Sequence, residues 1–343
     1  MSGSRTASGP RVSVLLPVRD AEATLEEALA SILDQTLEEL EVVAVDDGST
    51  DGSGEILRSA AREDPRVRVV SREPRGLVPA LELARARARS SFLARMDADD
   101  RSEPERLEAQ AALMDGNPDL VLSGTHVRYF PRNVLKGGAR RYERWLNSLC
   151  DPPALDRDLW VECPLAHPTF LARARAVEAV GGYRDLGWPE DYDLLLRLRL
   201  AGSRLGVVPR VLHHWREGPD RLSRTDPRYS PEAFRRLKAH FLARSPWLQG
   251  RNGVLVWGAG PVGKAFARAM ADEGVQVRAF VELNPRKVGQ EIHGAPVVPP
   301  EGIGDFRDAL GLAAVGQEGA RTEIRAAFAA AGWVEGRDFV AVA

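Results

Sequence analysis

Strand and helix patterns alternate four times between residues 12 and 96, and this alternation limits the fold more than any other feature. Each short apolar run is followed by a segment in which apolar residues recur every three or four positions, which predicts buried strands and amphipathic helices. Such an alternation favours a parallel α/β sheet that is covered by helices on both faces. The expected strands are residues 12–16, 41–45, 67–70 and 92–96, and the expected helices are residues 22–34, 54–62 and 77–89.

Three carboxylates follow the fourth expected strand within four positions. Asp97, Asp99 and Asp100 come directly after its apolar run. In an open α/β sheet the carboxyl ends of the strands form the ligand-binding edge, and like charges there need a counter-charge, which Mg²⁺ or Mn²⁺ supplies. The alternative is a solvated acidic turn, in which Asp100 or Ser102 caps a helix that begins near Pro104.

A second acidic loop, residues 46–53, follows the second expected strand and precedes a helix. Its carboxylates are able to accept hydrogen bonds from the N–H of a base or from ribose hydroxyls. Asp, Gly, Ser and Thr are also common turn and N-cap residues. This loop alone therefore does not decide between a nucleotide site and a simple turn.

Composition and charge indicate a soluble globular chain that is long enough for two domains. The 343 residues are 44% hydrophobic and 28% charged, and the net charge of −2 gives no electrostatic reason to expect nucleic acid or an anionic membrane as a partner. No apolar run approaches the length of about 18 residues that a membrane-spanning helix needs. Cys150 and Cys163 form no disulfide framework and no zinc spacing, which favours a reducing cytoplasm.

Five blocks of this sequence, in the same order, are similar to those of family 2 glycosyltransferases, which have a GT-A nucleotide-sugar-binding fold. The resemblance covers about residues 11–230. It implies a metal-dependent, inverting enzyme of glycan or polysaccharide biosynthesis that moves a sugar from a nucleotide-diphosphate donor to a hydroxyl of a glycan, lipid-linked or small-molecule acceptor. The blocks are VSVLLPVRDAEATLEEALASILDQT at 12–36, VVAVDDGSTDGS at 42–53, FLARMDADDRSEPERLEAQ at 92–110, HPTFLARARAVEAVGGYRD at 167–185 and EDYDLLLRLRLAG at 190–202.

The resemblance also implies roles for residues on the donor side. Pro17 and Val18 would border the nucleotide, and Asp47 would contact the base. Asp97 would face the ribose and diphosphate, and Asp97 and Asp99 together would hold Mn²⁺ or Mg²⁺.

Asp191, in the pair Glu190–Asp191, resembles the catalytic base of the inverting members. Inverting transfer needs a carboxylate that deprotonates the acceptor hydroxyl and a metal that neutralises the departing diphosphate, and both motifs are present. The pair also precedes an expected helix at residues 194–200, where the helix macrodipole favours negative charge. We therefore expect a low pKa for Asp191 and an ionised base at neutral pH.

The segment after the proposed base departs from the family pattern. Many members have a histidine there, whereas the matching position in this chain falls near Gly218. His213 or His214 is an alternative metal or diphosphate ligand, and ordinary polar packing is the other interpretation. Arg216 is the better candidate for holding diphosphate, since a guanidinium matches phosphate geometry. Residues 127–158 are rich in Arg, Tyr and Trp, which indicates either sugar stacking at an acceptor site or packing, and the same two interpretations apply to Trp145 and Trp160.

The strand and helix pattern restarts after an expected linker. A strand at 253–257 leads into the glycine turn GAGPVG, a helix and a second strand that ends at Glu282. This order is typical of a dinucleotide-binding fingerprint, in which Gly258, Gly260 and Gly263 let the backbone approach phosphate. A nucleotide or dinucleotide ligand is one interpretation, and a ligand-free role in dimerisation or docking is the other.

We therefore expect a disordered leader at residues 1–10, a GT-A nucleotide-diphospho-sugar transferase domain at 11–245 and a small Rossmann-like α/β domain at 251–343. The expected enzyme is a cytoplasmic glycosyltransferase, without a membrane span or a nucleic-acid partner, that is able to form a homo-oligomer. The rival interpretations are an NAD(P)-dependent oxidoreductase led by the C-terminal domain and an inactive nucleotide-sugar-binding scaffold. The first lacks an obvious acid/base set in its own domain, and a dead site would have no chemical need for Asp191.

Overall fold

A computed structural model describes residues 9–219 and 221–343, which divide into two compact units. The chain passes from one unit to the other five times, so that each unit is built from segments that are distant in sequence. The domain boundary predicted between residues 245 and 251 lies within the second unit. The first unit comprises the residues up to Pro152, residues 165–186 and residues 190–221; the second comprises residues 153–164, 187–189 and 222–343.

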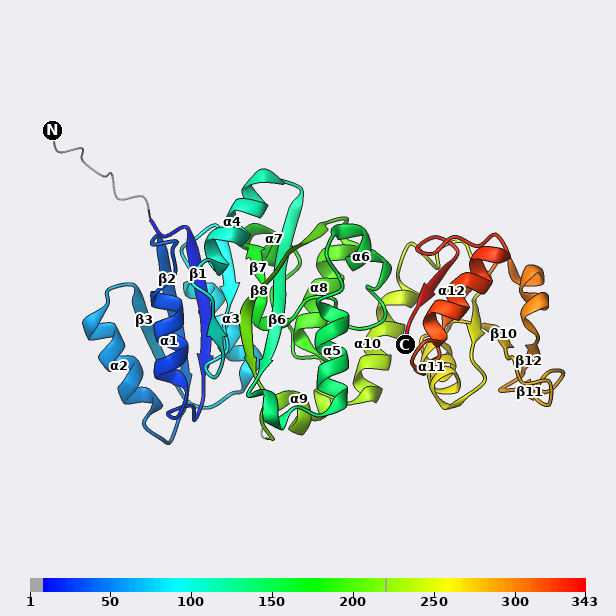
Figure 1. Cartoon of the computed structure of the whole chain (residues 1–343), viewed down its shortest axis with the longest axis horizontal. Helices are drawn as coiled ribbons and strands as arrows, with labels where there is room; N and C mark the ends of the chain where they lie inside the picture. The colour runs from blue at the N-terminus through cyan, green and yellow to red at the C-terminus, as the bar shows by residue number, and fades with distance from the viewer. Residues whose placement is uncertain (1–8, 220) are drawn as a thin grey trace. The chain divides into compact units, whose positions relative to one another are not determined.

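Eight strands form the sheet of the first unit, in the order β3-β2-β1-β4-β7-β6-β8-β5 (Figure 1). The first four strands in this order are parallel, as the alternation predicted. Strand β7 lies between β4 and β6 and is antiparallel to both, β6 and β8 are parallel, and β5 is antiparallel to the end of β8. The strands are β1 (Val12–Val18), β2 (Leu40–Asp47), β3 (Val67–Arg72), β4 (Phe92–Arg95), β5 (Arg101–Ser102), β6 (Leu120–Phe130), β7 (Leu171–Arg173) and β8 (Arg204–Arg216).

Helices cover both faces of this sheet because alternate residues of its buried strands point to opposite sides. The apolar faces of α1, α2 and α4 join one side of β1 and β2 in a single core, and α3 packs against the same two strands. The helix expected near Pro104 begins at Arg106, and its N-cap residue makes no side-chain capping bond, so neither Asp100 nor Ser102 caps it. The helices are α1 (Leu25–Leu33), α2 (Ser53–Glu63), α3 (Leu77–Arg87), α4 (Arg106–Gly116), α5 (Gly137–Leu146), α7 (Ala174–Ala179) and α8 (Glu190–Leu200), with 3-10 turns η1 (Arg132–Val134) and η2 (His167–Thr169).

The second unit contains a six-stranded sheet in the order β11-β12-β10-β9-β13-β14 (Figure 1). The five strands from β12 to β14 are parallel, and numbered from β9 they follow the order 3-2-1-4-5 of a doubly wound sheet. The strands are β9 (Val254–Trp257), β10 (Val277–Val281), β11 (Glu291–Ile292), β12 (Ala295–Val298), β13 (Leu310–Ala313) and β14 (Phe339–Ala341). The helices are α6 (Pro152–Arg157), α9 (Leu222–Thr225), α10 (Pro231–Ala243), α11 (Pro261–Asp272) and α12 (Ala320–Ala330), with 3-10 segments η3 (Pro227–Tyr229) and η4 (Pro300–Phe306).

The second unit has its own core, which draws on segments far apart in the chain. Helix α10 packs against α11, and the buried ammonium of Lys238 donates to the carbonyls of Val161, at 3.1 Å, and Val342, at 2.7 Å. The ring centres of Trp160 and Trp247 are 5.7 Å apart. The buried apolar residues of this core include Val254, Leu255, Phe280, Ile324 and Phe328.

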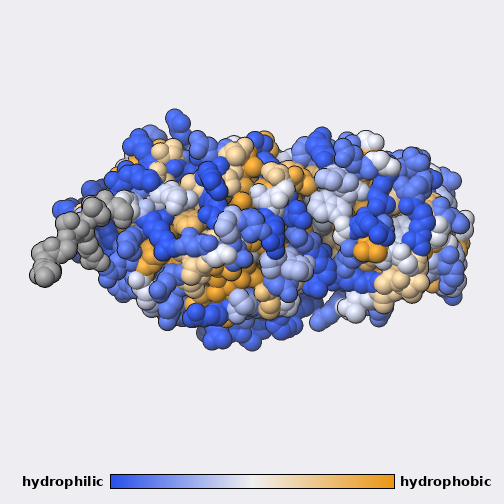
Figure 2. Space-filling view, turned by 90° about the horizontal axis from the view of Figure 1, so that it is seen from above, coloured by the Kyte–Doolittle hydropathy of each residue, from blue (hydrophilic) through white to orange (hydrophobic). Residues whose placement is uncertain are grey.

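Hydrophilic residues cover most of the face shown in Figure 2, and hydrophobic residues reach the surface there in small areas. None of the helices in residues 9–219 and 221–343 combines the length and the apolar character that crossing a bilayer requires.

Candidate active site

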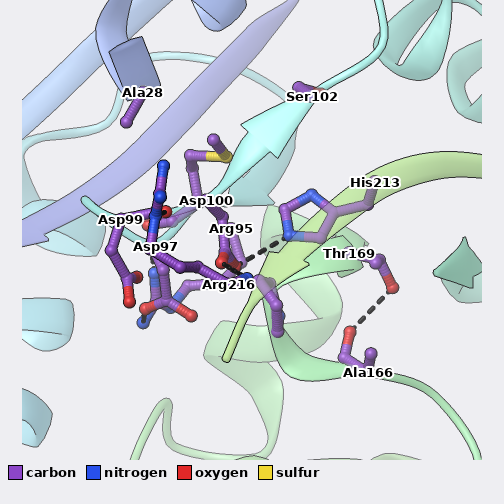
Figure 3. Close-up of polar contacts among 12 residues, drawn as sticks. Ala28, Arg95, Asp97, Asp99, Asp100, Ser102, Ala166, Thr169, His213 and Arg216 are labelled. Atoms are coloured by element: carbon purple, nitrogen blue, oxygen red, sulfur yellow. Dashed lines mark hydrogen bonds and ion pairs between the residues drawn. The ribbon is translucent and has the colours of Figure 1, made fainter. Parts of the chain in front are cut away.

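The acidic turn after β4 places three carboxylates at the edge of the first sheet (Figure 3). Asp97, Asp99 and Asp100 each offer one oxygen, and these oxygens lie within 4.8 Å of one another. Asp97 and Asp99 are half-buried, and Asp100 is buried. Hard oxygen donors at this spacing are the ligands that Mg²⁺ and Mn²⁺ take in proteins, so the residues present fit the metal that the family resemblance implies.

The three carboxylates differ in how far their pKa values are shifted. Burial raises the pKa of Asp99 to about 7, and repulsion from Asp100 and Asp97 adds to this effect. Burial also raises the pKa of Asp100. For Asp97, burial works in the same direction, but the adjacent Arg95 guanidinium outweighs it and the pKa is lowered. The cluster therefore lacks positive charge at Asp99, where a bound cation would supply it.

Asp100 faces inward and is held by a buried polar chain. It accepts a backbone N–H of β8 at 2.7 Å, and its second oxygen lies 2.8 Å from Nε2 of His213. Nδ1 of His213 lies 3.1 Å from the Arg106 guanidinium, which is a donor only, so Nδ1 accepts and Nε2–H donates to Asp100. His214 pairs through Nε2 with Glu103. Polar packing thus describes both histidines.

Arg216, the predicted diphosphate ligand, holds the acidic turn from the end of β8. Its Nε–H donates to the backbone carbonyl of Asp99 at 2.6 Å, and its guanidinium pairs with Glu27. The guanidinium carbon also lies 4.4 Å from the centre of the Phe130 ring. The Arg216 side chain is therefore already engaged in positioning one of the predicted metal ligands.

A second arginine, Arg221, acts on the same cluster and was not among the predicted site residues. Its guanidinium carbon lies 4.5 Å from the centre of the Trp215 ring, and its Nη1 lies 3.3 Å from the Glu217 carboxylate. Its positive charge acts to lower the pKa of each of the three acids, although the pKa values of Asp99 and Asp100 remain raised by burial. No sequence signal marks it, because only the folding of β8 beside the acidic turn brings it there.

Asp191 lies where the sequence predicted, in the first turn of α8, which begins at Glu190. The low pKa expected for it is wrong: burial raises the pKa of Asp191 to about 6, with His167 working to lower it and Glu190 to raise it. Loss of solvent therefore outweighs the helix macrodipole. A carboxyl with this pKa is still mostly ionised at pH 7.

His167, in η2, connects the proposed base with the acid cluster. Its Nδ1 lies 3.5 Å from the Glu190 carboxylate and its Nε2 lies 3.0 Å from the hydroxyl of Tyr183. The imidazole also works to lower the pKa of both Asp97 and Asp191. The imidazole therefore lies beside the Glu190–Asp191 pair, and its charge also acts on Asp97 of the acid cluster.

Asp47 ends β2 and is buried. Its carboxylate accepts Nε–H of Arg72 at 2.7 Å and the backbone N–H groups of Arg75, at 2.9 Å, and Gly76, at 2.6 Å. These bonds fix the loop that follows β3. Asp47 therefore has a structural role in the loop beside the position that the family resemblance implies for a base.

The ends of β1 and β2 bring the other predicted donor residues together. Pro17 and Val18 are in register with Val45 and Asp46 of the neighbouring strand. Asp46 accepts the backbone N–H of Ser49 at 3.0 Å, which is a turn-forming bond. Because β1 lies between β2 and β4, these residues share one sheet edge with the acid cluster.

The aromatic residues of β6 and of the segment that follows it divide between two environments. Tyr129 stacks on Trp215 with ring centres 5.0 Å apart, and Tyr142 and Trp145 of α5 stack at 5.6 Å. Trp145 is half-buried, whereas Trp160 is only 1% exposed and belongs to the core of the second unit. The packing interpretation is therefore the one that the structure supports for Trp160.

The curled α/β sheet, with its acids at the ends of β2 and β4, defines a nucleotide-diphospho-sugar transferase fold of the GT-A type. S. aureus TarS 1–349, crystallised in complex with UDP-GlcNAc, superposes with a TM-score of 0.53 over 69% of this chain and 67% of its own, at 18% identity. A second crystal structure of S. aureus TarS 1–349 gives a TM-score of 0.55 over 77% of this chain and 71% of its own, at 18% identity. The fold that the sequence predicted is confirmed.

Sequence comparison gives the family. The profile of glycosyl transferase family 2 matches residues 13–181. The putative glycosyltransferase EpsE of Bacillus subtilis is 32% identical over 67% of this chain and 84% of its own. The amylovoran biosynthesis glycosyltransferase AmsE of Erwinia amylovora is 33% identical over 62% of this chain and 78% of its own. The chain belongs to glycosyltransferase family 2, and it is a glycosyltransferase.

Proposed function

We propose that this glycosyltransferase is metal-dependent and inverting, and that it moves a sugar from a nucleotide-diphosphate donor to a hydroxyl of a glycan, lipid-linked or small-molecule acceptor. The observations that support the proposal are an acid cluster whose oxygens lie within 4.8 Å of one another and a separate carboxylate, Asp191, next to the Glu190 that lies 3.5 Å from His167. A cation-binding cluster and a base within one site are the minimum that a single displacement at the anomeric carbon requires.

On the metal side, Asp97 and Asp99 are the proposed ligands. A cation held there would neutralise the charge that develops on the departing diphosphate. Asp100 is committed to His213 and to the backbone of β8, so we assign it to positioning the turn. Arg95 supports the same arrangement, since its guanidinium keeps Asp97 ionised.

On the donor side, we propose that the nucleotide lies along the ends of β1 and β2, bordered by Pro17 and Val18 and with its base toward Asp47. Arg216 stays a proposed diphosphate ligand, although its guanidinium is engaged with Glu27. Arg221 is an additional proposal for the same role, because it already acts electrostatically on the acids that would hold the metal.

Asp191 is the proposed base. It would accept the proton of the acceptor hydroxyl while the hydroxyl oxygen attacks the anomeric carbon and the bond to the diphosphate breaks on the opposite face. A pKa of about 6 suits this role, since the carboxylate is ionised before the attack and is basic enough to take the proton.

The proposal is tested by titrating the full chain with UDP-, GDP- and dTDP-sugars, with Mn²⁺ and with a chelator, and by following donor hydrolysis by mass spectrometry. We expect one donor class to bind and to require the cation. The anomeric configuration of the transferred sugar, read by NMR, should be opposite to that of the donor. Donor binding that is unchanged in the chelator would contradict metal dependence, and a retained configuration would contradict inversion.

For the second unit we propose a nucleotide or dinucleotide site at the turn between β9 and α11. Gly258 has a φ of +124°, and a Cβ added at Gly263 would lie 1.8 Å from the Gly258 carbonyl, so these two glycines are needed for close packing. The space beside Gly260 is open, as an approaching phosphate requires. The turn also lies at the switch point of the sheet, between β9 and β13.

Glu282 bears on the identity of that ligand. Its carboxylate accepts the backbone N–H groups of Leu283 and Asn284 and pairs with Lys287 at 2.8 Å, so a ribose would have to compete for it. Calorimetric titration with NAD⁺, NADP⁺ and ADP tests the proposal. Binding of none of them, together with a dimer by light scattering, would favour the docking interpretation instead.

A further inference from the structure

One short segment of the first unit carries a net positive charge, although the net charge of the whole chain is negative. We call residues 128–144, from the end of β6 through η1 and α5, the basic segment. It holds six Lys and Arg residues and one acid, a net charge of +5, so with −2 for the whole chain the other residues carry −7. The six cations are Arg128, Arg132, Lys136, Arg140, Arg141 and Arg144, and the acid is Glu143.

Helix α5 has one face that packs on the core and one exposed face that is charged. Leu146 is buried, whereas Arg140, Arg141 and Arg144 are exposed and lie on one side at helical spacing. Trp145 lies half-buried at the border between the two faces. A helix with a cationic face bordered by an aromatic ring is typical of elements that rest on an anionic bilayer surface.

Three of the six cations of the basic segment have side chains without a partner in the fold. Arg132 pairs with Glu143 and Arg140 donates to backbone carbonyls, whereas the side chains of Arg128, Lys136 and Arg144 make no hydrogen bond or ion pair with any residue in the ranges 9–219 and 221–343. Val134, between them in η1, is 50% exposed. Exposed cations without internal partners are available to neutralise an external anion.

The basic segment also borders the active site. Phe130, at the end of β6, lies under the guanidinium of Arg216, which donates to the backbone carbonyl of Asp99. The start of the basic segment therefore lies close to the acid cluster.

We propose that the basic segment docks this enzyme on an anionic phospholipid bilayer, with the cations of α5 and η1 against the headgroups. Long-range attraction of this kind acts within about one Debye length of the membrane and needs no spanning helix. The docked orientation presents the acid cluster to acceptors that the membrane carries. The inference goes beyond the proposed transfer reaction and does not depend on it.

The test is co-sedimentation of the full chain with two kinds of vesicle, one of phosphatidylcholine alone and one with about one third phosphatidylglycerol. The variant R128Q/K136Q/R144Q removes three unpaired cations of the basic segment. The matched control R87Q/R175Q/R210Q removes three exposed arginines elsewhere in the first unit whose side chains make no ion pair with the described residues. Circular dichroism and the thermal midpoint confirm that both variants fold.

We expect wild type and the control to bind the anionic vesicles, with affinity that falls as NaCl rises from about 0.1 M to about 0.5 M. The basic-segment variant should bind roughly 100-fold more weakly, since each cation near the surface contributes about a tenfold factor or less. Equal losses in the two variants, or wild-type binding by the basic-segment variant, would overturn the proposal. So would a wild-type protein that binds soluble dextran sulfate but neither vesicle, because the partner would then be a polyanionic glycan.

Discussion

Both units contain a run of parallel strands, yet acids beside these strands differ in how their charge is balanced. In the first unit, burial and mutual repulsion raise the pKa of Asp99 to about 7. In the second, the Arg337 guanidinium lowers the pKa of Asp338 to about 2, and Lys287 with two backbone N–H groups lowers the pKa of Glu282 although burial opposes them. Asp338 and Glu282 of the second unit are therefore neutralised locally, whereas Asp99 of the first unit is left short of positive charge.

This difference shows how a site is recognised from physics when two regions share an architecture. A glycine turn and a strand-end acid occur in the second unit, but its carboxylates already have partners. The acid cluster with unbalanced charge lies at the edge of the first sheet, within the region that the family profile matches.

The largest effect should come from Asp99→Ala. We expect at least a roughly 10³-fold loss of Mn²⁺-dependent donor turnover, because the metal stabilises the leaving diphosphate. The thermal midpoint in a chelator should stay unchanged or rise, since a repelled charge is removed.

The matched change in the second unit is Asp338→Asn, which should lower the stability of the fold and leave donor turnover unchanged. It removes a carboxylate that is paired with Arg337 and Arg251, so we expect about 1 kcal/mol of lost stability, a few degrees in the thermal midpoint, and wild-type donor turnover. If Asp99→Ala kept the Mn²⁺-dependent donor affinity of wild type, Asp99 would not be a metal ligand, and the contrast between the two units would not hold.

The next effect concerns the proposed base. Asp191→Asn should bind donor nearly as well as wild type and lose turnover by roughly 10²-fold or more. In wild type, a base with a pKa of about 6 is active when deprotonated, so kcat/KM should fall as the pH is lowered through about 6. A variant that keeps most of its turnover at saturating acceptor would move the role elsewhere, with Glu190 as the next candidate.

A smaller effect should follow from His167→Gln. The imidazole works to lower the pKa of Asp191, so its removal should move the acidic limb of the pH profile to higher pH. At pH 6 the rate should fall by roughly threefold to tenfold, with little change at pH 8. Tyr183→Phe is the control, because it removes only the hydroxyl that contacts Nε2 of His167. An unshifted limb in His167→Gln would mean that His167 does not act on the base.

The smallest effect on chemistry should come from truncation to residues 1–245. Both proposed carboxylate sites lie within the first unit, so we expect donor hydrolysis within a few-fold of the full chain. The truncation removes the ring contact of Trp160 with Trp247 and the packing of α10 against α11. We therefore expect the thermal midpoint to fall by about 5 °C or more. Donor turnover, circular dichroism and light-scattering mass report these outcomes. A folded truncated protein without donor turnover would show that the second unit contributes to the active site.

The sequence predicted the fold more completely than it predicted the site. Alternation of strand and helix is a local property, so β1 to β4 and their helices followed from residue spacing. The pairing of β8 with β5 and β6 joins segments about a hundred residues apart and leaves no local signal. Residues that depend on that pairing, such as Arg221 and the buried His213, could not be assigned from spacing alone.

Burial explains the one wrong electrostatic prediction. The position of Asp191 at a helix start is visible in the sequence and favours a low pKa. The loss of water around it depends on packing by distant segments, among them His167, and burial raised the pKa instead. The position of Asp191 at a helix start could be predicted from the sequence, whereas its pKa could not.

The interleaving of the two units has a consequence for synthesis on the ribosome. Val161 belongs to the second unit, and the Lys238 ammonium that anchors its carbonyl follows 77 residues later. At translation rates of about 5 to 20 residues per second, the segment around Trp160 waits about 4 to 15 s for its partners. During that time the rest of the first unit is synthesised, while residues 153–164, which include Trp160, stay without their partners in the second unit.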